Sequence, residues 1–427
     1  MAVRLPIIRA GICAISLFAV SQPAHAMSVE DARSAIDAIL MQSGISATEI
    51  DARALDGDAV ELIYDSVSLD LSGYSEPRQL LMDDVQVTVR NTDNPDHIDL
   101  DIKLPERARM DAEATSDQRD MTMRNAGGYL RWDIARNVPI TFDGFANALM
   151  GDEPVTRKHW MMNGLVIQWL PELARISWQA AEWTGANREK RGSIKSTSFV
   201  LYPGDDGATH LDYAHDGLWL PSLIQPRTVR IKSSSDGLPW TEAQPIIQQG
   251  FHDILTGTAP RIARRQIGDA LWQRAAHNGA PVKVDEFYVE SRGLEALGAG
   301  EFLAQAAARY GFTGSFDFKL LGQDKLVDLL GTPDSPTLLG ALVPFAVDSL
   351  AAGRPGPQGT MEYDGELLPD GRVLVGGHAP INTAYLFSLN LEELGLSPND
   401  GRDPSFEIYS PPYMFKDRPE IQGAPEQ

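Results

Sequence analysis

The densest group of metal-binding side-chain types lies in the run THLDYAHDG, which contains His210, Asp212, His215 and Asp216. Because side chains alternate between the two faces of a β-strand, a strand here would place His210 and Asp212 on one face and His215 on the other. Zinc needs three or four ligands that converge on one point. The pattern therefore favours a solvated strand, ending in a turn at Asp216 and Gly217, over a metal site.

A second group of acids could suggest a calcium loop. The run NTDNPDHIDLDI holds Asp93, Asp96, Asp99 and Asp101. An EF-hand loop also needs a central glycine and a terminal glutamate at fixed spacing, and neither is present. Pro95 indicates an ordinary turn. We therefore expect no metal ligands and no cofactor from either group.

Signatures of nucleophilic catalysis and of phosphate binding are missing from the sequence. It contains no G-x-S-x-G run, no lysine three residues after a serine and no G-x-x-x-x-G-K-[ST] run. Cys13 is the only cysteine and lies in the N-terminal apolar run, so we expect no thiol nucleophile, disulfide or Cys-type zinc site after export. We therefore expect no catalytic residue and no enzymatic activity.

A segment rich in tryptophan and methionine is the candidate for binding an apolar ligand. Aromatic rings often line hydrophobic pockets, and methionine adapts to irregular apolar shapes. The alternative is that these residues form the core between a sheet and the helices that cover it. The candidate ligand-binding residues are Trp160, Met161, Met162, Trp169, Trp178 and Trp183.

The first 26 residues predict export. Two arginines precede an apolar run at 10–20, and Ala24 and Ala26 stand in the A-x-A arrangement of a cleavage site. The apolar run is too short to span a bilayer. We expect a cleaved signal peptide at 1–26, a mature chain that begins at Met27, and a periplasmic or secreted protein.

The charge of the chain restricts its partners. With 59 acidic against 37 basic residues, the formal net charge is −22, which repels nucleic-acid phosphates and anionic lipid head groups. No later apolar run reaches the roughly 18 residues that a transmembrane helix needs. Because 43% of the 427 residues are hydrophobic, the chain can bury a core without disulfides. The partner classes that remain are a lipid-like or apolar ligand and an envelope protein.

Hydrophobic periodicity predicts an α+β fold, with β-rich antiparallel sheets, short covering helices and a partly extended C-terminal tail. Ser28 as N-cap, an apolar stripe and Gly44 predict a first helix. Alternation with a period of two then predicts antiparallel strands with one wet face at 59–71, 85–89 and 98–104. Further strands are expected at 198–202, 210–220, 228–233 and 282–291, and helices at 240–251, 260–277, 303–310, 324–330 and 337–351.

A breaker-rich run, GRPGPQG at 353–359, predicts a linker. It would separate a β-rich envelope domain at 27–352 from a C-terminal segment at 360–427. No repeat of about 20–50 residues precedes that segment, which argues against a β-propeller in this chain.

Three runs resemble a known family of envelope proteins. They are DGDAVELIYDSVSLDL near the start, ATHLDYAHDGLWLP in the middle and GLEALGAGEFLAQAAARYGFTGSFDFKLLGQDKLVDLL towards the end. On these motifs, residues 27–356 resemble the DUF-two-one-two-five family of Gram-negative envelope proteins. The resemblance implies an envelope location and a β-rich fold, and it brings no established activity and no active residues.

The tail carries a second resemblance. Residues 367–419, which include LLPDGRVLVGGHAPIN and SFEIYSPPYMFKDRP, resemble the C-terminal region of galactose-oxidase-like (kelch radical-copper) oxidases. That family implies copper held by tyrosine and histidine. Here Met361 and Glu362 occupy the positions of a Tyr-His pair, Tyr363 is displaced, and Asp403 replaces a further histidine. Because Cu(II) favours imidazole ligands, we expect an appendage without the copper site.

These patterns leave three hypotheses. The favoured one is an exported, non-enzymatic envelope protein that binds an apolar or lipid-like ligand or a protein partner. The first alternative is a copper-dependent oxidase or an inactive remnant of one. The second is a mosaic chain, in which a non-functional tail was joined to an unrelated domain near 353–359.

Overall fold

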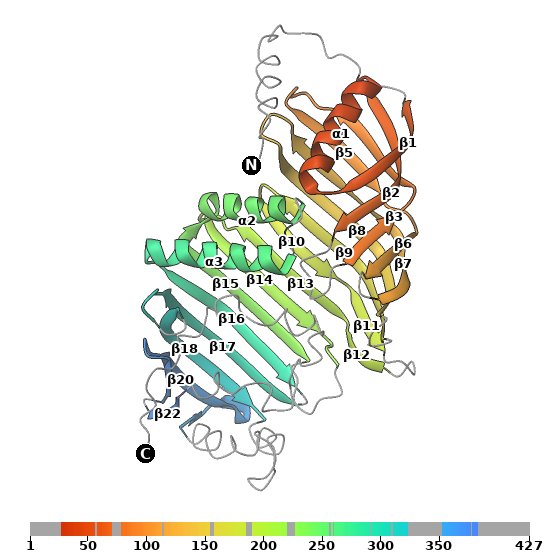
Figure 1. The fold of residues 1–427 in the computed structure, drawn as a ribbon. Helices are drawn as coiled ribbons and strands as arrows, with labels where there is room; N and C mark the ends of the chain where they lie inside the picture. The colour runs from red at the N-terminus through yellow and green to blue at the C-terminus, as the bar shows by residue number, and fades with distance from the viewer. Residues whose placement is uncertain are drawn as a thin grey trace, which may run out of the picture.

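The computed structural model describes most of the chain between Met27 and residue 382 (Figure 1). The predicted signal peptide at 1–26, the helices predicted at 324–330 and 337–351, and Asp403 lie outside the described residues. The described residues are 27–55, 58–70, 78–112, 115–153, 158–184, 190–219, 227–255, 258, 260–291, 293–308, 311–322, 352–376 and 378–382.

Helix α1 spans Val29–Ser43 and has the two predicted caps. The Ser28 hydroxyl accepts a hydrogen bond from the backbone N–H of Asp31 at 3.1 Å, and Gly44 ends the helix with a φ of 64°. These caps satisfy backbone groups that have no partner within a helix. Ile36, on the apolar stripe, is 4% exposed, because this side of the helix packs on the sheet.

The strands of the first half of the chain follow α1 with short connections. They are β1 (Ser46–Ala54), β2 (Ala59–Asp70), β3 (Arg78–Met82), β4 (Val85–Asn91), β5 (His97–Lys103), β6 (Arg107–Ala112), β7 (Thr115–Asp133), β8 (Val138–Glu153), β9 (Lys158–Leu170), β10 (Leu173–Trp178), β11 (Ala180–Thr184) and β12 (Lys190–Ile194).

In the second half, the described residues form two longer helices within a run of strands. Helix α2 spans Trp240–Leu255 and α3 spans Pro260–Asn278, which confirms both predicted helices. The strands are β13 (Ser196–Pro203), β14 (Ala208–Asp216), β15 (Thr228–Pro239), β16 (Pro281–Ser291), β17 (Leu294–Ala304), β18 (Phe312–Leu321), β19 (Arg354–Pro355), β20 (Met361–Leu367), β21 (Arg372–Val375) and β22 (His378–Asn382).

These strands form one 22-stranded sheet with antiparallel neighbours, which confirms the predicted β-rich α+β class. Its main hydrogen-bonded order is β1-β2-β4-β5-β7-β8-β9-β10-β13-β14-β15-β16-β17-β18-β20-β21-β22. Strands that follow each other in sequence are therefore mostly neighbours in space. This long meander lets residues of many strands line up across one face.

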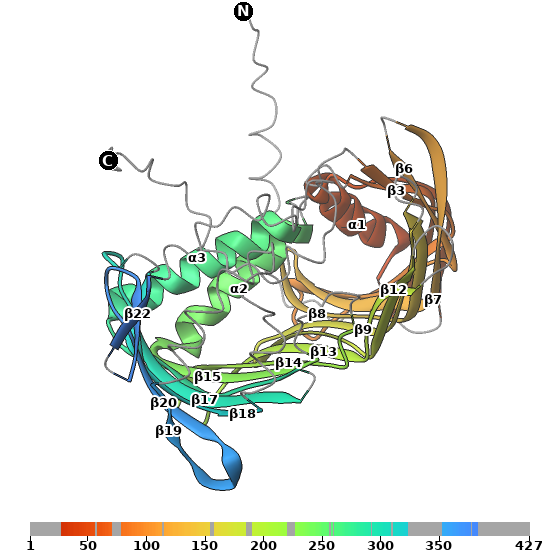
Figure 2. The same cartoon turned by 90° about the horizontal axis from the view of Figure 1, so that it is seen from below.

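The three α-helices of the described residues lie on the concave side of the curved sheet (Figure 2). We call this side the inner face and the opposite side the outer face. Successive strand residues point to opposite faces, so one face of an antiparallel sheet can be apolar while the other meets water. The placement of the helices follows from this alternation, because their apolar sides need an apolar surface to cover.

Three long strands change partners next to a residue with left-handed backbone. β2 pairs with β4 and then β3, β7 with β6 and then β5, and β9 with β11 and then β10. The left-handed residues are Ser66, Asn125 and Gly164, with φ of 52°, 44° and 60°. A Cβ atom at Gly164 would also lie 2.8 Å from Cγ of Gln179. Such irregularities re-aim side chains, and here they split the sheet into two branches.

The first half has a closed core under α1. Its largest side chain is Trp132, which is 1% exposed, and its indole Nε1 donates to Asn137 Oδ1 at 3.1 Å. Burial of this many aliphatic side chains is the main stabilising contribution in this half. The most deeply buried aliphatic members are Ala32, Val60, Leu62, Val89, Ile98 and Leu100.

Helices α2 and α3 lie in the connection between β15 and β16, which are hydrogen-bonded neighbours in the sheet. The Trp240 indole Nε1 donates to the backbone oxygen of Pro171 at 2.6 Å, which ties the start of α2 to the β9–β10 turn. Glu242 of α2 accepts from Arg274 at 2.6 Å and Asn278 at 2.9 Å, both near the end of α3. These hydrogen bonds lower the pKa of Glu242 to about 2 and fix the helix pair.

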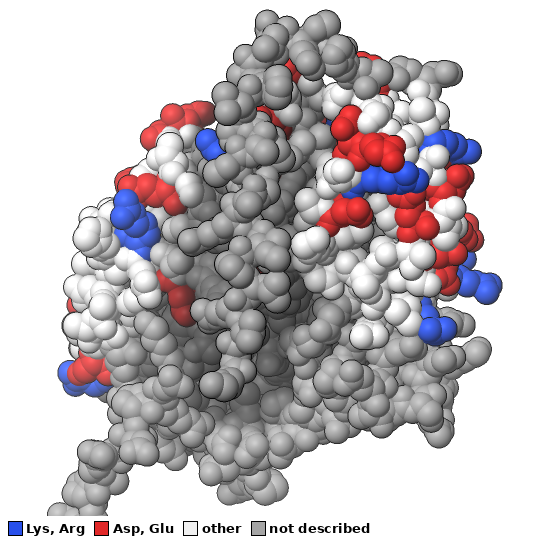
Figure 3. Space-filling view, turned by 45° about the horizontal axis from the view of Figure 1, so that its top comes forward, with Lys and Arg blue, Asp and Glu red and all other residues white. Residues whose placement is uncertain are grey.

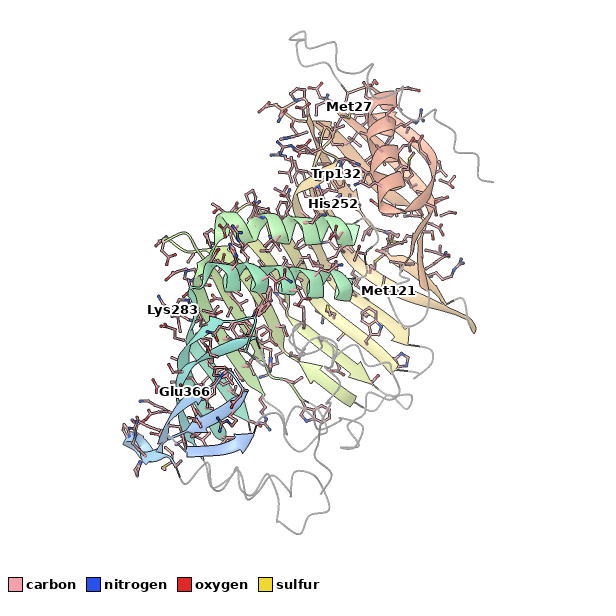
Figure 4. All side chains as sticks on the ribbon, turned by 60° about the vertical axis from the view of Figure 1, so that its left-hand side comes forward. Met27, Met121, Trp132, His252, Lys283 and Glu366 are labelled. Carbon is pink, nitrogen blue, oxygen red and sulfur yellow. The ribbon has the colours of Figure 1, made fainter. Side chains whose placement is uncertain are left out.

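The end of α2 joins the two halves of the sheet (Figure 4). The ring of His252 lies 6.4 Å from that of Trp132, and its Nε2 lies 3.3 Å from Nε2 of Gln42 on α1. Gln248 Nε2 donates to the backbone oxygen of Pro139 at 2.9 Å. One helix therefore contacts both α1 and the first core.

Residues on both sides of the predicted linker at 353–359 belong to the same sheet. β19 lies within that run and pairs with β20, and β20 pairs along its whole length with β18. Tyr363 of β20 is 2% exposed and stacks on Phe318 of β18 with 4.6 Å between ring centroids. The described part of the C-terminal segment therefore extends the sheet.

The helix predicted at 303–310 is wrong. Leu303 and Ala304 end β17 and pair with Thr313 and Phe312 of β18. The chain then turns, and the backbone N–H of Gln305 donates to the oxygen of Gly311 at 2.8 Å. The alanine-rich run has high helix propensity, but strand pairing on both sides of it overrides this weak local preference.

Replacing Tyr363 with alanine tests whether β20 belongs to the core. We expect a loss of about 3–5 kcal/mol in the free energy of unfolding, as for other buried aromatic side chains. Glu366→Ala is the matched control, because Glu366 lies on the same strand and is exposed; we expect a change within about 0.5 kcal/mol. Chemical denaturation measures both. Equal midpoints for Tyr363→Ala and the wild type would contradict the packing of β20.

Candidate ligand-binding surface

The cross-strand register lines up inner-face residues in rows across the second half of the sheet. Directly opposite residues on neighbouring strands have Cβ atoms about 5 Å apart, so such a row is a continuous surface. The row nearest the helices packs against Ile247 of α2 and is part of the second core. This covered row consists of Phe142, Trp169, Ala174 and Leu201.

A second row lies two residues further along each strand, and several of its side chains remain accessible. Ile176, Phe199 and Phe287 are 39%, 37% and 39% exposed although they lie on the inner face. With five strand spacings of about 4.8 Å, the row is roughly 24 Å long. This open row consists of Ile167, Ile176, Phe199, Tyr213, Ile231 and Phe287.

A third row borders the open row on the side away from the helices. It contains two polar residues that are almost completely buried: Thr197 is 6% exposed and His215 is 1% exposed. This third row consists of Trp178, Thr197, His215, Val229 and Val289.

The inner face of this half carries no charged residue at its described strand positions. Apart from His215, these positions hold apolar, glycine, serine, threonine or tyrosine residues. On four of these strands the inner-face residues are Thr197, Phe199 and Leu201 of β13; Thr209, Leu211, Tyr213 and His215 of β14; Val229, Ile231, Ser233 and Ser235 of β15; and Gly314, Phe316, Phe318 and Leu320 of β18.

The outer face of the same strands is charged and paired. Lys232 of β15 lies 3.1 Å from Glu286 of β16, and Lys319 of β18 lies 3.0 Å from Glu362 of β20. Arg230 lies over the ring of Tyr288. Figure 3 is drawn from the helix side of the molecule rather than from this outer face, and it shows acidic and basic side chains on the described surface there. The charges of the strands are therefore placed on one face, where water solvates them.

Nε1 of Trp169, in the covered row, has no hydrogen-bond partner in the described structure, and two polar atoms of the third row also have none. They are Nε1 of Trp178 and Oγ1 of Thr197, which lie in register on β10 and β13. The neighbouring Tyr213 hydroxyl, by contrast, lies 3.0 Å from Nδ1 of His215. A buried donor without a partner costs about 1–3 kcal/mol, so this arrangement destabilises the free protein.

The predicted tryptophan and methionine cluster is divided between different surfaces. Trp169 belongs to the covered row and is 1% exposed, as the core alternative predicts. Trp178 lies in the third row. Strand alternation places Trp160 and Met162 on one face of β9 and Met161, which is 38% exposed, on the other. Trp183 lies on β11 in register with Trp160, and its side chain lies outside the described part.

The sequence reasoning missed most residues of the open row. Their alternation within each strand is visible in the sequence, for example at Phe199 and Leu201 or at Val229 and Ile231. What joins them into one surface is the register between strands, and a single sequence does not state that register.

The His/Asp group lies on a strand, as expected. His210 and Asp212 are on the outer face of β14 and His215 is on the inner face, and Gly217, with a φ of 65°, follows the strand end. Asp99 of the second acidic group pairs with Arg131 at 2.7 Å. Within the described ranges, no three His, Cys, Asp or Glu side chains are grouped as a metal site would require.

No helix in the described part of the chain is both long enough and apolar enough to cross a membrane. Comparisons with protein-family models, with curated proteins and with solved structures found no match. The two resemblances drawn from sequence motifs therefore stay predictions.

Thr197→Val tests whether the Thr197 hydroxyl, which has no partner, lowers the free energy of unfolding. Valine has nearly the same shape and no polar atom, so we expect the free energy of unfolding to rise by about 1 kcal/mol. Thr228→Val is the matched control: Thr228 is equally buried at 6%, but its hydroxyl donates to Asp216 at 3.0 Å. We expect that control to lose stability. A loss of stability in Thr197→Val as well, measured by denaturation, would show that its hydroxyl is satisfied.

Proposed function

We propose that the protein is an exported, non-enzymatic envelope protein that binds an apolar, acyl-chain ligand on its inner face. One observation carries the proposal: an uncharged sheet face on which Ile176, Phe199 and Phe287 remain more than a third exposed. Isolated exposed apolar residues are normal, but a contiguous apolar row indicates a binding surface.

The shape of the open row favours a long, thin ligand. The row is roughly 24 Å long and about one residue wide, between the covered row and the third row. Binding would remove the remaining apolar area from water, at about 25 cal/mol per Å². An extended acyl chain matches this shape better than a compact polar metabolite does.

Export and location enter the proposal through the sequence. The basic, apolar and A-x-A parts of residues 1–26 support secretion, and the net charge of −22 disfavours nucleic acid as a partner. A protein partner that presents apolar side chains is the alternative occupant of the same row. If a protein partner is the occupant and the row does not suit an alkyl chain, the isolated protein would not bind small alkyl probes.

A copper oxidase is the second candidate, and the donor set argues against it. Met361 and Glu362 supply no imidazole, and the Tyr363 ring is buried against Phe318. Burial raises the pKa of the Tyr363 phenol, which disfavours the phenolate that would bind a metal ion. Stoichiometric copper in protein purified from copper-supplemented medium, together with peroxide release from an alcohol, would favour the oxidase instead.

Phe199→Asp tests the proposed surface. Phe199 is exposed enough for a carboxylate to be hydrated in the free protein, but a bound alkyl chain would have to desolvate it. We expect the affinity for an alkyl-pyrene probe to fall at least about tenfold, which corresponds to about 1.4 kcal/mol. Fluorescence titration measures it.

Leu297→Asp is the matched control, because Leu297 is 48% exposed and lies on the outer face of β17. We expect it to bind the probe as the wild type does. Absence of probe binding by the wild-type protein, or equal loss in both variants, would sink the proposal.

A further inference from the structure

We infer that the ligand carries a neutral hydrogen-bond acceptor, such as an ester carbonyl, that binds Nε1 of Trp178 and Oγ1 of Thr197. The inference rests on the proposed function and deepens it, because it assigns the head of the ligand and the direction in which the chain lies. The acyl chain would run from this donor pair along the open row towards Phe287.

The donor pair is formed by directly opposite residues on two neighbouring strands of the sheet. Trp178 and Thr197 are directly opposite each other on β10 and β13, and strand alternation places both side chains on the inner face. Thr197 is more than nine-tenths buried, and both polar atoms lack a partner in the described structure. They border Ile176 and Phe199 of the open row, which lie two residues away on the same strands.

Unpartnered donors of this kind point to a ligand because they cost stability without one. Both could be replaced by apolar residues of the same shape, and the free protein would gain stability. Both atoms are closed to solvent in the free protein, so a bordering side chain must turn aside before an acceptor in the row can reach them. The hydrogen bonds would then form away from water, where they contribute most. The site would then select against a plain hydrocarbon of equal length.

The charge of the surroundings favours a neutral head over an anion. The described inner-face positions of β10 and of β13 to β20 carry no lysine or arginine, and a buried anion without a cation is costly. His215, the one titratable side chain in the third row, has its Nδ1 3.0 Å from the Tyr213 hydroxyl. An ester carbonyl meets two neutral donors without introducing charge.

The experiment compares three pyrene-labelled probes of equal chain length: a methyl ester, a free fatty acid and an alkane. It uses the full exported chain at pH 8, and fluorescence titration gives each affinity. We expect the wild type to bind the ester most tightly. In Thr197→Val and in Trp178→Phe, we expect the ester affinity to fall about three- to tenfold and the alkane affinity to stay unchanged.

Two matched variants control for changes elsewhere on the sheet. Thr209→Val and Trp169→Phe also remove a buried polar atom that has no partner, but they lie in other rows. We expect both to bind the ester as the wild type does. Because Thr197→Val is expected to be more stable than the wild type, loss of ester binding in that variant would not reflect unfolding.

The outcomes separate this inference from the proposed function. If the wild type binds ester and alkane equally, or binds the acid more tightly than the ester, the assigned head is wrong while the apolar surface stands. Loss of ester affinity in the Thr209 and Trp169 controls as well would also overturn the assignment of the donor pair. If no probe binds the wild type, the proposed function itself is wrong.

Discussion

The alternation of side chains along antiparallel strands governs the rest of this structure. From β13 to β20 the described strands place their lysine, arginine, aspartate and glutamate residues on the outer face, where pairs such as Lys232 and Glu286 form. The inner face is left apolar, and the hydrophobic effect requires that something cover it. Helices α1, α2 and α3 lie on that face for this reason. The position of α2 between the two halves of the sheet follows from the same requirement.

The helices do not use the whole inner face. Under α1 the core is closed, with Leu62 and Val89 completely buried, whereas the open row keeps Phe199 and Phe287 accessible. The protein also tolerates Thr197 and Trp178 as buried donors without partners. A stable fold can carry a few such costs where they serve binding. Thr197 and Trp178 lie beside the open row, whereas the unpartnered polar atoms of Trp169 and Thr209 lie in other rows.

The sequence predicts the local elements well and the connections between them poorly. Ser28 and Gly44 mark α1 because capping chemistry is local, and the helices at 240–251 and 260–277 follow from their apolar stripes. The helix at 303–310 fails because pairing with β18 outweighs alanine propensity. The left-handed residues Ser66 and Asn125 and the register of the open row are set by contacts between distant strands. Of the predicted ligand cluster, Trp178 borders that row, and Trp169 is in the core.

Photo-crosslinking with a diazirine-bearing acyl ester tests the central claim most directly. Mass spectrometry of the digested protein would locate the adducts on the chain. Adducts on inner-face residues of the open row, such as Phe199, Ile231 and Phe287, would support an acyl chain lying across β13 to β16. Adducts confined to outer-face residues such as Leu297 and Met161, or no adducts above those formed with unfolded protein, would contradict it.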